Sequence, residues 1–280
     1  MDKMAETEHI ETRLLLEAIF LKYGYDFRSY AEASIGRRIQ RNMRLNGCVH
    51  ISELQHRILT DAAAFQQLMT DLSVSVTEMF RNPDFYQALR RHVLPELLRI
   101  PFVKIWCAGC ATGEEVYSLA ILLEEEGIIQ QVQIYATDIN ESALQIAEKG
   151  IYPLDKMKEY TTNYHRMKGR GSFADYYAAL YDHAVMRLRL KKNMTFAHHN
   201  MVTDGSFGEM NLILCRNVMI YFNRDLQNRV FQLFCDSLTA DGFLCLGSKE
   251  TLQYAECANQ FENVNAREKI YRKKVIRPEL

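Results

Sequence analysis

Hydrophobic side chains recur at three- and four-residue steps through the first part of the chain. The two clearest series are Ile10, Leu14, Ala18 and Leu21, and then Ile35, Ile39 and Met43. Gly47 signals a helix end, a capping-box pattern at residues 52–55 predicts the next helix start, and Asp61 is placed to cap a helix that ends near Leu72. No strand pattern interrupts this part, so we predict a small all-α domain over residues 1–72.

Residues 73–98 are predicted to connect this domain to the rest of the chain. The stretch from Ser73 to Thr77 is β-branched and extended in character. Pro83 stands at the first position of a helix that reaches about Leu98, a place that proline favours.

Beyond the connector, strand-like runs alternate with helical runs. The predicted strands cover residues 102–107, 132–137, 194–198, 211–215 and 242–247, and the predicted helices cover 113–126, 140–150 and 223–238. This alternation implies an α/β domain over residues 99–280 with a mostly parallel, doubly wound, Rossmann-like sheet. Two runs at 261–264 and 269–272 predict an antiparallel pair at the C-terminus. Residues 155–192 break the rhythm and are predicted to form a small insertion, with one strand candidate at 185–190.

The composition fits a globular protein of two units. The chain has 280 residues, of which 48% are hydrophobic and 25% charged, and these values argue against a disordered or fibrous protein. The formal net charge of -1 supplies no overall field that would hold nucleic acid or an anionic membrane. A local charged patch could still hold either one, but we expect no nucleic acid as a partner.

Cysteine usage and the first residues both favour the cytoplasm. The seven cysteines are an odd number without the spacing of a disulfide framework, which fits reduced thiols. The first ten residues contain acids and no apolar signal region, and no window reaches the length of a membrane span. We expect a cytoplasmic protein that does not insert into the membrane.

The strongest chemical signal lies between the first strand of the α/β domain and its helix. Residues 105–115 read Ile-Trp-Cys-Ala-Gly-Cys-Ala-Thr-Gly-Glu-Glu, and small residues at such a turn let the backbone approach a ligand closely. The segment lacks the Gly-Lys-Ser/Thr of a phosphate loop and has only Gly109 and Gly113 where a dinucleotide fingerprint needs three glycines. A tight turn without a ligand is the plainer alternative.

Asp138 ends the second strand of this domain. A carboxylate at that place can accept two hydrogen bonds from a ribose diol. Its alternative role is to cap the helix that follows. Together with the glycine turn, Asp138 favours an adenosyl cofactor.

A third polar signal follows the strand at 211–215. Arg216 and Asn217 come directly after buried residues, and side chains just past the carboxyl end of a parallel strand face the ligand crevice. The sequence Asn/Asp-Pro-Pro-Tyr, which would suggest methylation of a base amine, is absent here, so a DNA methyltransferase is disfavoured. Cys107 and Cys110 lack a second Cys/His pair at ligand spacing, so we expect packing and no metal site.

Four segments, in order, resemble the CheR-type chemotaxis receptor methyltransferases, which are protein-glutamate O-methyltransferases. They are residues 77–82 (Thr-Glu-Met-Phe-Arg-Asn), 109–115 (Gly-Cys-Ala-Thr-Gly-Glu-Glu), 136–139 (Ala-Thr-Asp-Ile) and 215–221 (Cys-Arg-Asn-Val-Met-Ile-Tyr). The resemblance covers nearly the whole chain and implies a class I S-adenosylmethionine (SAM)-methyltransferase domain, with SAM as donor and S-adenosylhomocysteine (SAH) as product. It also implies that the substrate is a glutamate side chain on an acidic helical region of a chemoreceptor or related signalling protein.

The resemblance further implies roles for individual residues. Thr77 and Arg81 would bind the methionine end of SAM, Glu114 its ammonium group and Asp138 its ribose. Residues 200–201 would flank the adenine. The full cofactor-binding set implied is Ser75, Thr77, Arg81, Ala108, Gly109, Glu114, Asp138, Asn200, Met201, Arg216 and Asn217.

Two features depart from the family pattern. Ser75 stands where the family often has an asparagine that contacts the cofactor. The insertion at 155–192 differs from the better-known members, in which a small β-subdomain grips a peptide tail of the receptor. Whether this chain has that grip stays open at the level of sequence.

Ester formation asks little acid–base chemistry of the protein. A glutamate carboxylate, with a reference pKa of about 4.3, is already a nucleophile at neutral pH. What remains is positioning, and the implied catalytic residues are Arg81, Arg216 and Tyr221. We expect the Tyr221 hydroxyl near the reacting oxygen, with one of the two arginines orienting the carboxylate.

The helix predicted around residues 35–45 carries the expected substrate-docking surface. Arg37, Arg38, Arg41 and Arg44 lie away from its apolar stripe, and such a basic face suits a glutamate-rich receptor helix. A solvated arginine face is the alternative. We expect a monomeric enzyme; a SAM-binding sensor or adaptor without turnover, and a methyltransferase with another substrate, are the competing interpretations.

Overall fold

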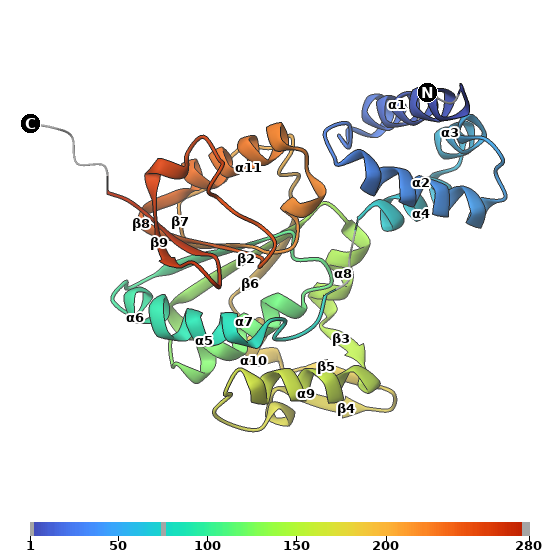
Figure 1. Ribbon diagram of the computed structural model, residues 1–280. Coiled ribbons are helices and arrows are strands. Elements are labelled where there is room, and N and C mark those ends of the chain that lie inside the picture. The colour runs from blue at the N-terminus through green and yellow to red at the C-terminus, as the bar shows by residue number, and fades with distance from the viewer. Residues whose placement is uncertain (1–2, 74–76, 276–280) are drawn as a thin grey trace, which may run out of the picture.

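The computed structural model describes residues 3–73 and 77–275 of the chain. Figure 1 shows three parts: a helical bundle, a central sheet flanked by helices, and a small sheet with a helix beside it at the bottom of the view. The fold predicted from the sequence, an all-α N-terminal domain followed by a mostly parallel α/β domain with an insertion, is confirmed.

The helical domain consists of α1 (Lys3–Tyr23), α2 (Glu32–Asn46), α3 (Ile51–Thr60) and α4 (Ala62–Leu72). The stripe predicted on α2 is confirmed, because Ile35, Ile39 and Met43 are all buried in the core of this domain. Gly47 ends α2 in the left-handed conformation, with φ of 66°. Asp61 caps α4 by accepting a hydrogen bond from the Ala63 N–H at 2.8 Å.

Two details of this domain were predicted wrongly. The predicted stripe of α1 lies outward, with Ile10, Leu14 and Leu21 exposed, while Leu15 and Ile19 are fully buried. Hydrophobic residues surround most of α1, so spacing alone does not select the buried face. The helix predicted to start at a 52–55 capping box starts two residues earlier, with His50 as its N-cap, and the Glu53 carboxylate accepts the backbone N–H groups of residues 49 and 50.

The large sheet has the strand order β6-β2-β1-β7-β8-β10-β9. The strands are β1 (Val103–Ala108), β2 (Val132–Asp138), β6 (Met194–His198), β7 (Met210–Cys215), β8 (Leu238–Leu246), β9 (Phe261–Asn265) and β10 (Ile270–Lys273). The first five pair in parallel, and β10 runs antiparallel to both β8 and β9. The predicted antiparallel C-terminal pair is therefore confirmed.

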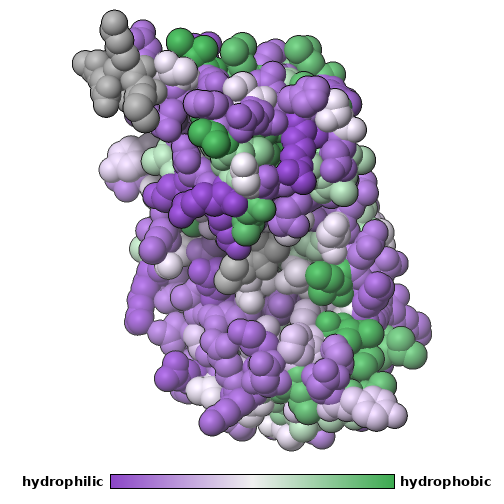
Figure 2. Space-filling view, turned by 90° about the vertical axis from the view of Figure 1, so that its right-hand side faces the viewer, coloured by the Kyte–Doolittle hydropathy of each residue, from purple (hydrophilic) through white to green (hydrophobic). Residues whose placement is uncertain are grey.

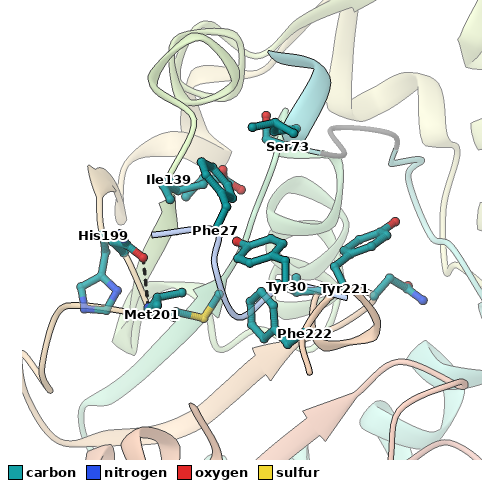
Figure 3. Close-up of a pocket in the computed structure, with 15 residues that line it drawn as sticks. Phe27, Tyr30, Ser73, Ile139, His199, Met201, Tyr221 and Phe222 are labelled. Carbon is teal, nitrogen blue, oxygen red and sulfur yellow. Dashed lines mark hydrogen bonds between the residues drawn. The ribbon is translucent and has the colours of Figure 1, made fainter. Parts of the chain in front are cut away.

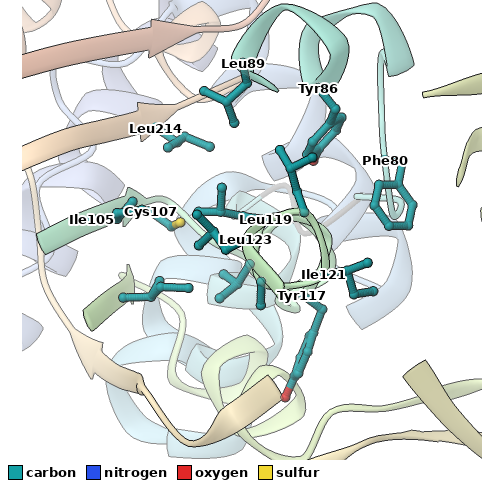
Figure 4. Close-up of a cluster of buried hydrophobic side chains, with 14 of the residues drawn as sticks. Phe80, Tyr86, Leu89, Ile105, Cys107, Tyr117, Leu119, Ile121, Leu123 and Leu214 are labelled. Atoms are coloured by element: carbon teal, nitrogen blue, oxygen red, sulfur yellow. The ribbon is translucent and has the colours of Figure 1, made fainter. Parts of the chain in front are cut away.

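Helices cover both faces of this sheet. The covering helices are α5 (Pro83–His92), α6 (Leu94–Leu97), α7 (Glu114–Glu125), α8 (Glu141–Lys149) and α11 (Arg224–Ser237). Successive residues of β1 serve opposite faces: Ile105 and Cys107 pack with α5 and α7, whereas Trp106 packs with α11. Figure 4 shows Leu119 and Leu123 of α7 pointing toward these β1 residues. Each such side chain stabilises the fold by about 1.5–3 kcal/mol.

The insertion between α8 and β6 is a small antiparallel sheet with a helix on it. Its elements are β3 (Ile151–Pro153), α9 (Met157–Arg166), β4 (Tyr177–Leu180), β5 (His183–Met186) and α10 (Leu188–Lys191), with strand order β3-β5-β4. The single strand predicted at 185–190 is wrong, because α10 occupies its second half. The alternating pattern misled there, since Met186 and Leu190 are buried while Leu188 is exposed.

A buried carboxylate ties the insertion to the large sheet. Glu125, at the end of α7, accepts hydrogen bonds from the Tyr164 hydroxyl, the Arg170 N–H at 2.9 Å and the Arg90 guanidinium. Hydrophobic side chains gather over the lower part of the face in Figure 2, and the insertion exposes Ile151, Leu180 and Leu188.

Within the described residues, no helix has both the length and the apolar character needed to span a membrane.

Candidate functional site

Two cavities lie at the carboxyl ends of the parallel strands, where the helical domain meets the sheet. The apolar cavity is lined by Phe27, Tyr30, Leu72, Ser73, Gly109, Asp138, Ile139, His199, Asn200, Met201, Val202, Asn217, Val218, Tyr221 and Phe222. The charged cavity is lined by Thr77, Arg81, Gly109, Cys110, Ala111, Glu115, Arg216, Asn217, Val218 and Tyr221. Four residues line both: Gly109, Asn217, Val218 and Tyr221. The two cavities therefore adjoin, and Figure 3 shows Tyr221 beside the apolar one.

The loop after β1 needs glycine at position 109. Gly109 has φ of 74°, and a Cβ there would meet Val218 Cγ2 at 2.6 Å. The N–H groups of Gly109 and Cys110 donate to the Thr137 carbonyl at 2.8 and 2.9 Å, which fixes the loop against the end of β2. Ala108, the last residue of β1, is buried beneath this loop. The loop thus brings backbone to the wall of both cavities.

Asp138 lies at the end of β2 and lines the apolar cavity. Its Oδ2 accepts the Ala111 N–H at 2.8 Å and its Oδ1 accepts the Asn140 N–H at 2.9 Å. Burial raises the pKa of Asp138. Asn140, whose side chain accepts from the Ala143 N–H, is the residue that caps α8. Each oxygen of Asp138 keeps a second lone pair for a ligand hydroxyl.

Asn200 and Met201 stand across the apolar cavity from the helical domain, after the end of β6. Asn200 is buried, and its side-chain oxygen accepts the Val202 N–H at 3.0 Å. Figure 3 shows Met201 near His199, with Ile139 on the neighbouring strand end. Ile139 and Met201 give this part of the cavity apolar walls, which suit an aromatic base.

The helical domain supplies one wall of the apolar cavity, which the sequence did not predict. Phe27 and Tyr30 come from the segment between α1 and α2, and the Tyr30 ring contacts both Phe27 and Phe222 (Figure 3). Ser73 accepts a hydrogen bond from the Asn140 side chain at 2.6 Å. A possible sequence signal was the cluster of aromatic residues between two helices at 23–30.

Backbone hydrogen bonds join this wall to residues 215–221, the segment that we call the catalytic-face motif, and to the residues just after it. The Ala31 N–H donates to the Tyr221 carbonyl at 2.7 Å, and the Asn223 N–H donates to the Ser29 carbonyl at 3.0 Å. Tyr30 and Phe222 form an isolated antiparallel bridge between them. The position of Tyr221 thus depends on both domains.

The Arg216 guanidinium is bound by other groups of the protein. Its guanidinium donates to Glu115 Oε2 at 2.6 Å, to Asn82 Oδ1 at 3.0 Å and to the Arg81 carbonyl at 3.2 Å. The group also stacks on Phe85, with 3.9 Å from Cζ to the ring centroid. Only 2% of the side chain is exposed, so Arg216 holds the connector and α7 around the charged cavity.

Glu114 and Glu115 open α7 and point in different directions. The Glu115 carboxylate lines the charged cavity beside Arg216. Glu114 is buried toward the insertion, where it accepts from the Thr112 hydroxyl at 2.7 Å and lies 3.5 Å from the Tyr160 hydroxyl. Burial raises the pKa of Glu114 to about 7. Glu114, which was predicted to bind the ammonium group, therefore makes these contacts with neutral hydroxyl groups and not with a cation.

The four arginines predicted on α2 divide into two groups. Arg37, Arg41 and Arg44 are exposed, and Arg41 Nε lies 4.0 Å from Asp71 Oδ1. Arg38 turns inward instead: it donates to the Leu72 carbonyl, and its guanidinium lies 4.8 Å from the centroid of the Tyr221 ring. Burial lowers the pKa of Arg38.

Of the other predicted site residues, Thr77 and Arg81 line the charged cavity, whereas Ser75 lies outside the described residues. Sequence reasoning missed the helical-domain wall, Glu115 and the buried Glu250 behind the motif. Glu115 could have been noticed because acids at a helix start often face ligands.

The pair of cavities fits an adenosyl sulfonium with its amino-acid end. The apolar cavity offers aromatic and aliphatic walls together with the Asp138 carboxylate, and the charged cavity offers groups of both signs in Arg81 and Glu115. A nucleoside suits the first set and a zwitterion suits the second.

Comparison with known proteins agrees with this fit. The model of the CheR methyltransferase SAM-binding domain matches residues 75–270, and that of the CheR methyltransferase all-alpha domain matches residues 10–73. Cher3 of Pseudomonas putida is 50% identical over 264 residues, which cover 94% of this chain and 97% of that protein. The chemotaxis protein methyltransferase of Listeria innocua is 30% identical over 82% of this chain and 85% of its own. The resemblance stated from four motifs is confirmed: the chain belongs to the CheR methyltransferase family.

Proposed function

We propose that this chain transfers the methyl group of SAM to glutamate side chains on the acidic helical region of a chemoreceptor in the cytoplasm, which yields glutamyl methyl esters and SAH. The observation that carries the proposal is the junction of the two cavities at Tyr221, next to the helical domain. A donor held across both cavities would present its reactive carbon near this junction, close to the exposed arginines of α2.

Within the apolar cavity, we assign the ribose to Asp138 and the adenine to the walls formed by Ile139, Asn200 and Met201. Asp138 suits the ribose because it lines this cavity and its carboxylate is oriented by the backbone N–H groups of Ala111 and Asn140.

Within the charged cavity, Thr77 and Arg81 suit the carboxylate of the amino-acid end. Of the two acids that open α7, Glu115 lines this cavity and Glu114 is buried toward the insertion, and a carboxylate of this pair suits the ammonium group. When bound, SAM supplies a methyl group that its sulfonium already activates. The chain therefore needs to orient and desolvate the reactants rather than to activate the donor.

The substrate side needs no general base, since a glutamate is ionised at neutral pH. Alignment of well-positioned reactants can lower a barrier by about 7–11 kcal/mol. Tyr221 is the residue to which we assign this alignment, because it lines both cavities and is held by Ala31 through its backbone. Arg216 keeps its positioning role, because its two terminal nitrogens already donate to Glu115, the Arg81 carbonyl and Asn82.

The docking surface is assigned to the helical domain over residues 1–72. Arg37, Arg41 and Arg44 are exposed on α2, which starts immediately after the segment that holds Tyr221. Hydrophilic side chains cover much of the helical domain on the face in Figure 2. A basic face beside the reaction site steers an acidic helix toward it.

The proposal is tested with full-length protein, methyl-labelled SAM and receptor-bearing membranes. Base-labile label on the receptor is expected, because methyl esters hydrolyse in alkali whereas N-methyl groups do not. Label that survives alkali would overturn the ester assignment, and SAH binding without any transfer would favour a sensor or adaptor. The Tyr221→Phe variant should bind SAH normally and turn over slowly; full turnover would remove Tyr221 from the mechanism.

A further inference from the structure

A buried carboxylate lies behind the catalytic-face motif and lines neither cavity itself. Glu250 follows β8 and is 4% exposed. Its Oε2 accepts the N–H groups of Gly247 at 2.6 Å and Asn217 at 2.9 Å. Its Oε1 accepts those of Val218 at 2.9 Å and Met219 at 2.7 Å. One side chain therefore satisfies three consecutive N–H groups of the motif.

These N–H groups belong to a stretch that does not follow regular structure. Asn217 has φ of 63°, a left-handed conformation that costs free energy for a residue other than glycine. Consecutive N–H groups next to such a residue turn toward one side and bind an anion. Glu250 supplies that anion from within the chain.

Glycine just after the end of β8 makes room for this contact. A Cβ on Gly247 would lie 2.7 Å from Glu250 Oε2 and 2.8 Å from the Asn217 nitrogen. Glycine at 247 thus lets β8 and the Asn217 backbone approach closely enough to share the carboxylate.

The backbone that Glu250 holds forms part of the walls of the two cavities. Asn217 and Val218 line both of them, and Val218 Cγ2 lies 2.6 Å from where a Cβ of residue 109 would be. Tyr221 lies one turn further along, with its N–H bonded to the Val218 carbonyl at 3.2 Å. A shift of the Asn217–Met219 backbone would therefore move the cofactor loop contact and Tyr221 together.

We propose that Glu250 is a positioning residue of the methyl-transfer site: its carboxylate fixes the backbone of residues 217–219, and thereby sets the places of Asn217, Val218 and Tyr221. The inference rests on the proposed function for its effect on turnover, but its effect on SAH binding stands apart from the identity of the substrate.

The main variant is Glu250→Gln, which keeps the shape but replaces one acceptor oxygen by a donor that faces two N–H groups. The matched control is Glu125→Gln, since Glu125 is an equally buried carboxylate that accepts a backbone N–H far from the cavities. Both variants are made in the full chain. Thermal unfolding, SAH calorimetry and hydrogen exchange at the amides of Val218 and Met219 are measured.

We expect Glu250→Gln to weaken SAH binding and to lower kcat by about 10- to 100-fold, since misplacement of about 1 Å has effects of that size. Exchange at the two amides should accelerate. Glu125→Gln should lower Tm at least as much and leave the SAH Kd unchanged. Glu250→Gln with normal SAH affinity and normal amide protection would overturn the proposal.

If Glu250→Gln does not fold, Gly247→Ala decides the question, because its methyl group would push Asn217 away from an intact carboxylate. Weaker SAH binding in that variant supports the proposal, and unchanged binding overturns it. If the wild-type protein binds SAH but makes no base-labile ester, the receptor assignment fails while the SAH measurements still test Glu250.

Discussion

Arg216 and the exposed arginines of α2 differ in their exposure to solvent and in their hydrogen bonds. The Arg216 side chain is 2% exposed and donates to three groups, whereas the Arg41 side chain is 70% exposed and its nearest acid lies 4.0 Å away. A buried charge must be fully paired because it has left water, while an exposed charge keeps its hydration and gains little from one neighbour. The first kind builds a site, and the second kind remains available to a partner.

The largest effect should come from Arg216→Met. The change leaves Glu115 without its cation and frees the connector, so we expect a loss of about 3–5 kcal/mol in the free energy of unfolding. Arg41→Met, the matched change on the exposed side, should stay within about 0.5 kcal/mol. Urea unfolding of both variants measures the difference.

A loss below about 1 kcal/mol for Arg216→Met would mean that this pair behaves like a surface ion pair. Burial would then not distinguish the contribution of Arg216 to stability from that of the exposed arginines of α2.

Sequence patterns recovered the fold where one periodicity dominated. The parallel strands were found because each is a short apolar run between turn signals, and α2 because its stripe is narrow. Prediction failed on α1, which has hydrophobic residues around most of its surface, and at 185–190, where alternation concealed a helix. Burial there is decided by tertiary partners that spacing does not reveal.

The site was predictable only where it lies next to strand ends. Asp138 and Asn217 follow buried strands, and parallel topology alone brings such residues to one edge. Phe27, Tyr30 and Glu250 come from other parts of the chain and reach the site through packing and backbone bonds. No local pattern marks a residue whose role is set by a distant segment.

A smaller effect should come from a change of Arg38, which lies between the buried Arg216 site and the exposed face of α2. Sequence spacing placed it with the docking arginines, but it stacks on Tyr221 and bonds the Leu72 carbonyl. The lost contacts contribute about 1–2 kcal/mol of interaction free energy that holds Tyr221 in place. We therefore expect Arg38→Met to lower kcat about tenfold. The receptor KM should stay near the wild-type value, and steady-state kinetics separate the two constants. A raised KM with normal kcat would return Arg38 to the docking face.

Protonation of Glu114 should give a further, more modest effect. Because burial raises its pKa to about 7, the folded state binds a proton that the unfolded state releases near pH 4.5. Its contribution to stability is thus present at low pH and is lost as pH rises through about 7.

If an ammonium group binds beside Glu114, the pKa of this carboxyl falls and a proton is released. Calorimetry of SAH binding at pH 6.5 should then depend on the ionisation enthalpy of the buffer, and the dependence should vanish at pH 9 or in Glu114→Gln. Equal heats in all buffers would assign the ammonium to Glu115 instead, which already faces the charged cavity.

The smallest effect on the protein itself should come from reversing the exposed charges. The double variant Arg37→Glu with Arg41→Glu should unfold like the wild type and bind SAH normally, because neither side chain lines a cavity described above. The receptor KM should rise about tenfold, which corresponds to about 1.4 kcal/mol. The control is Arg13→Glu with Arg57→Glu, which makes the same change of net charge at exposed positions of α1 and α3.

Salt separates the two regions most clearly in this last case. Screening at 0.1 M salt acts over about 10 Å, so it weakens exposed charges and hardly affects a buried pair. For the wild type, the receptor KM should rise with salt while kcat and SAH affinity hold, since Arg216 and Glu115 are shielded from ions. In the double variant the receptor KM should lose this salt dependence, whereas the control should keep it. A control as impaired as the double variant would mean that net charge, rather than the face of α2, brings the receptor to the site.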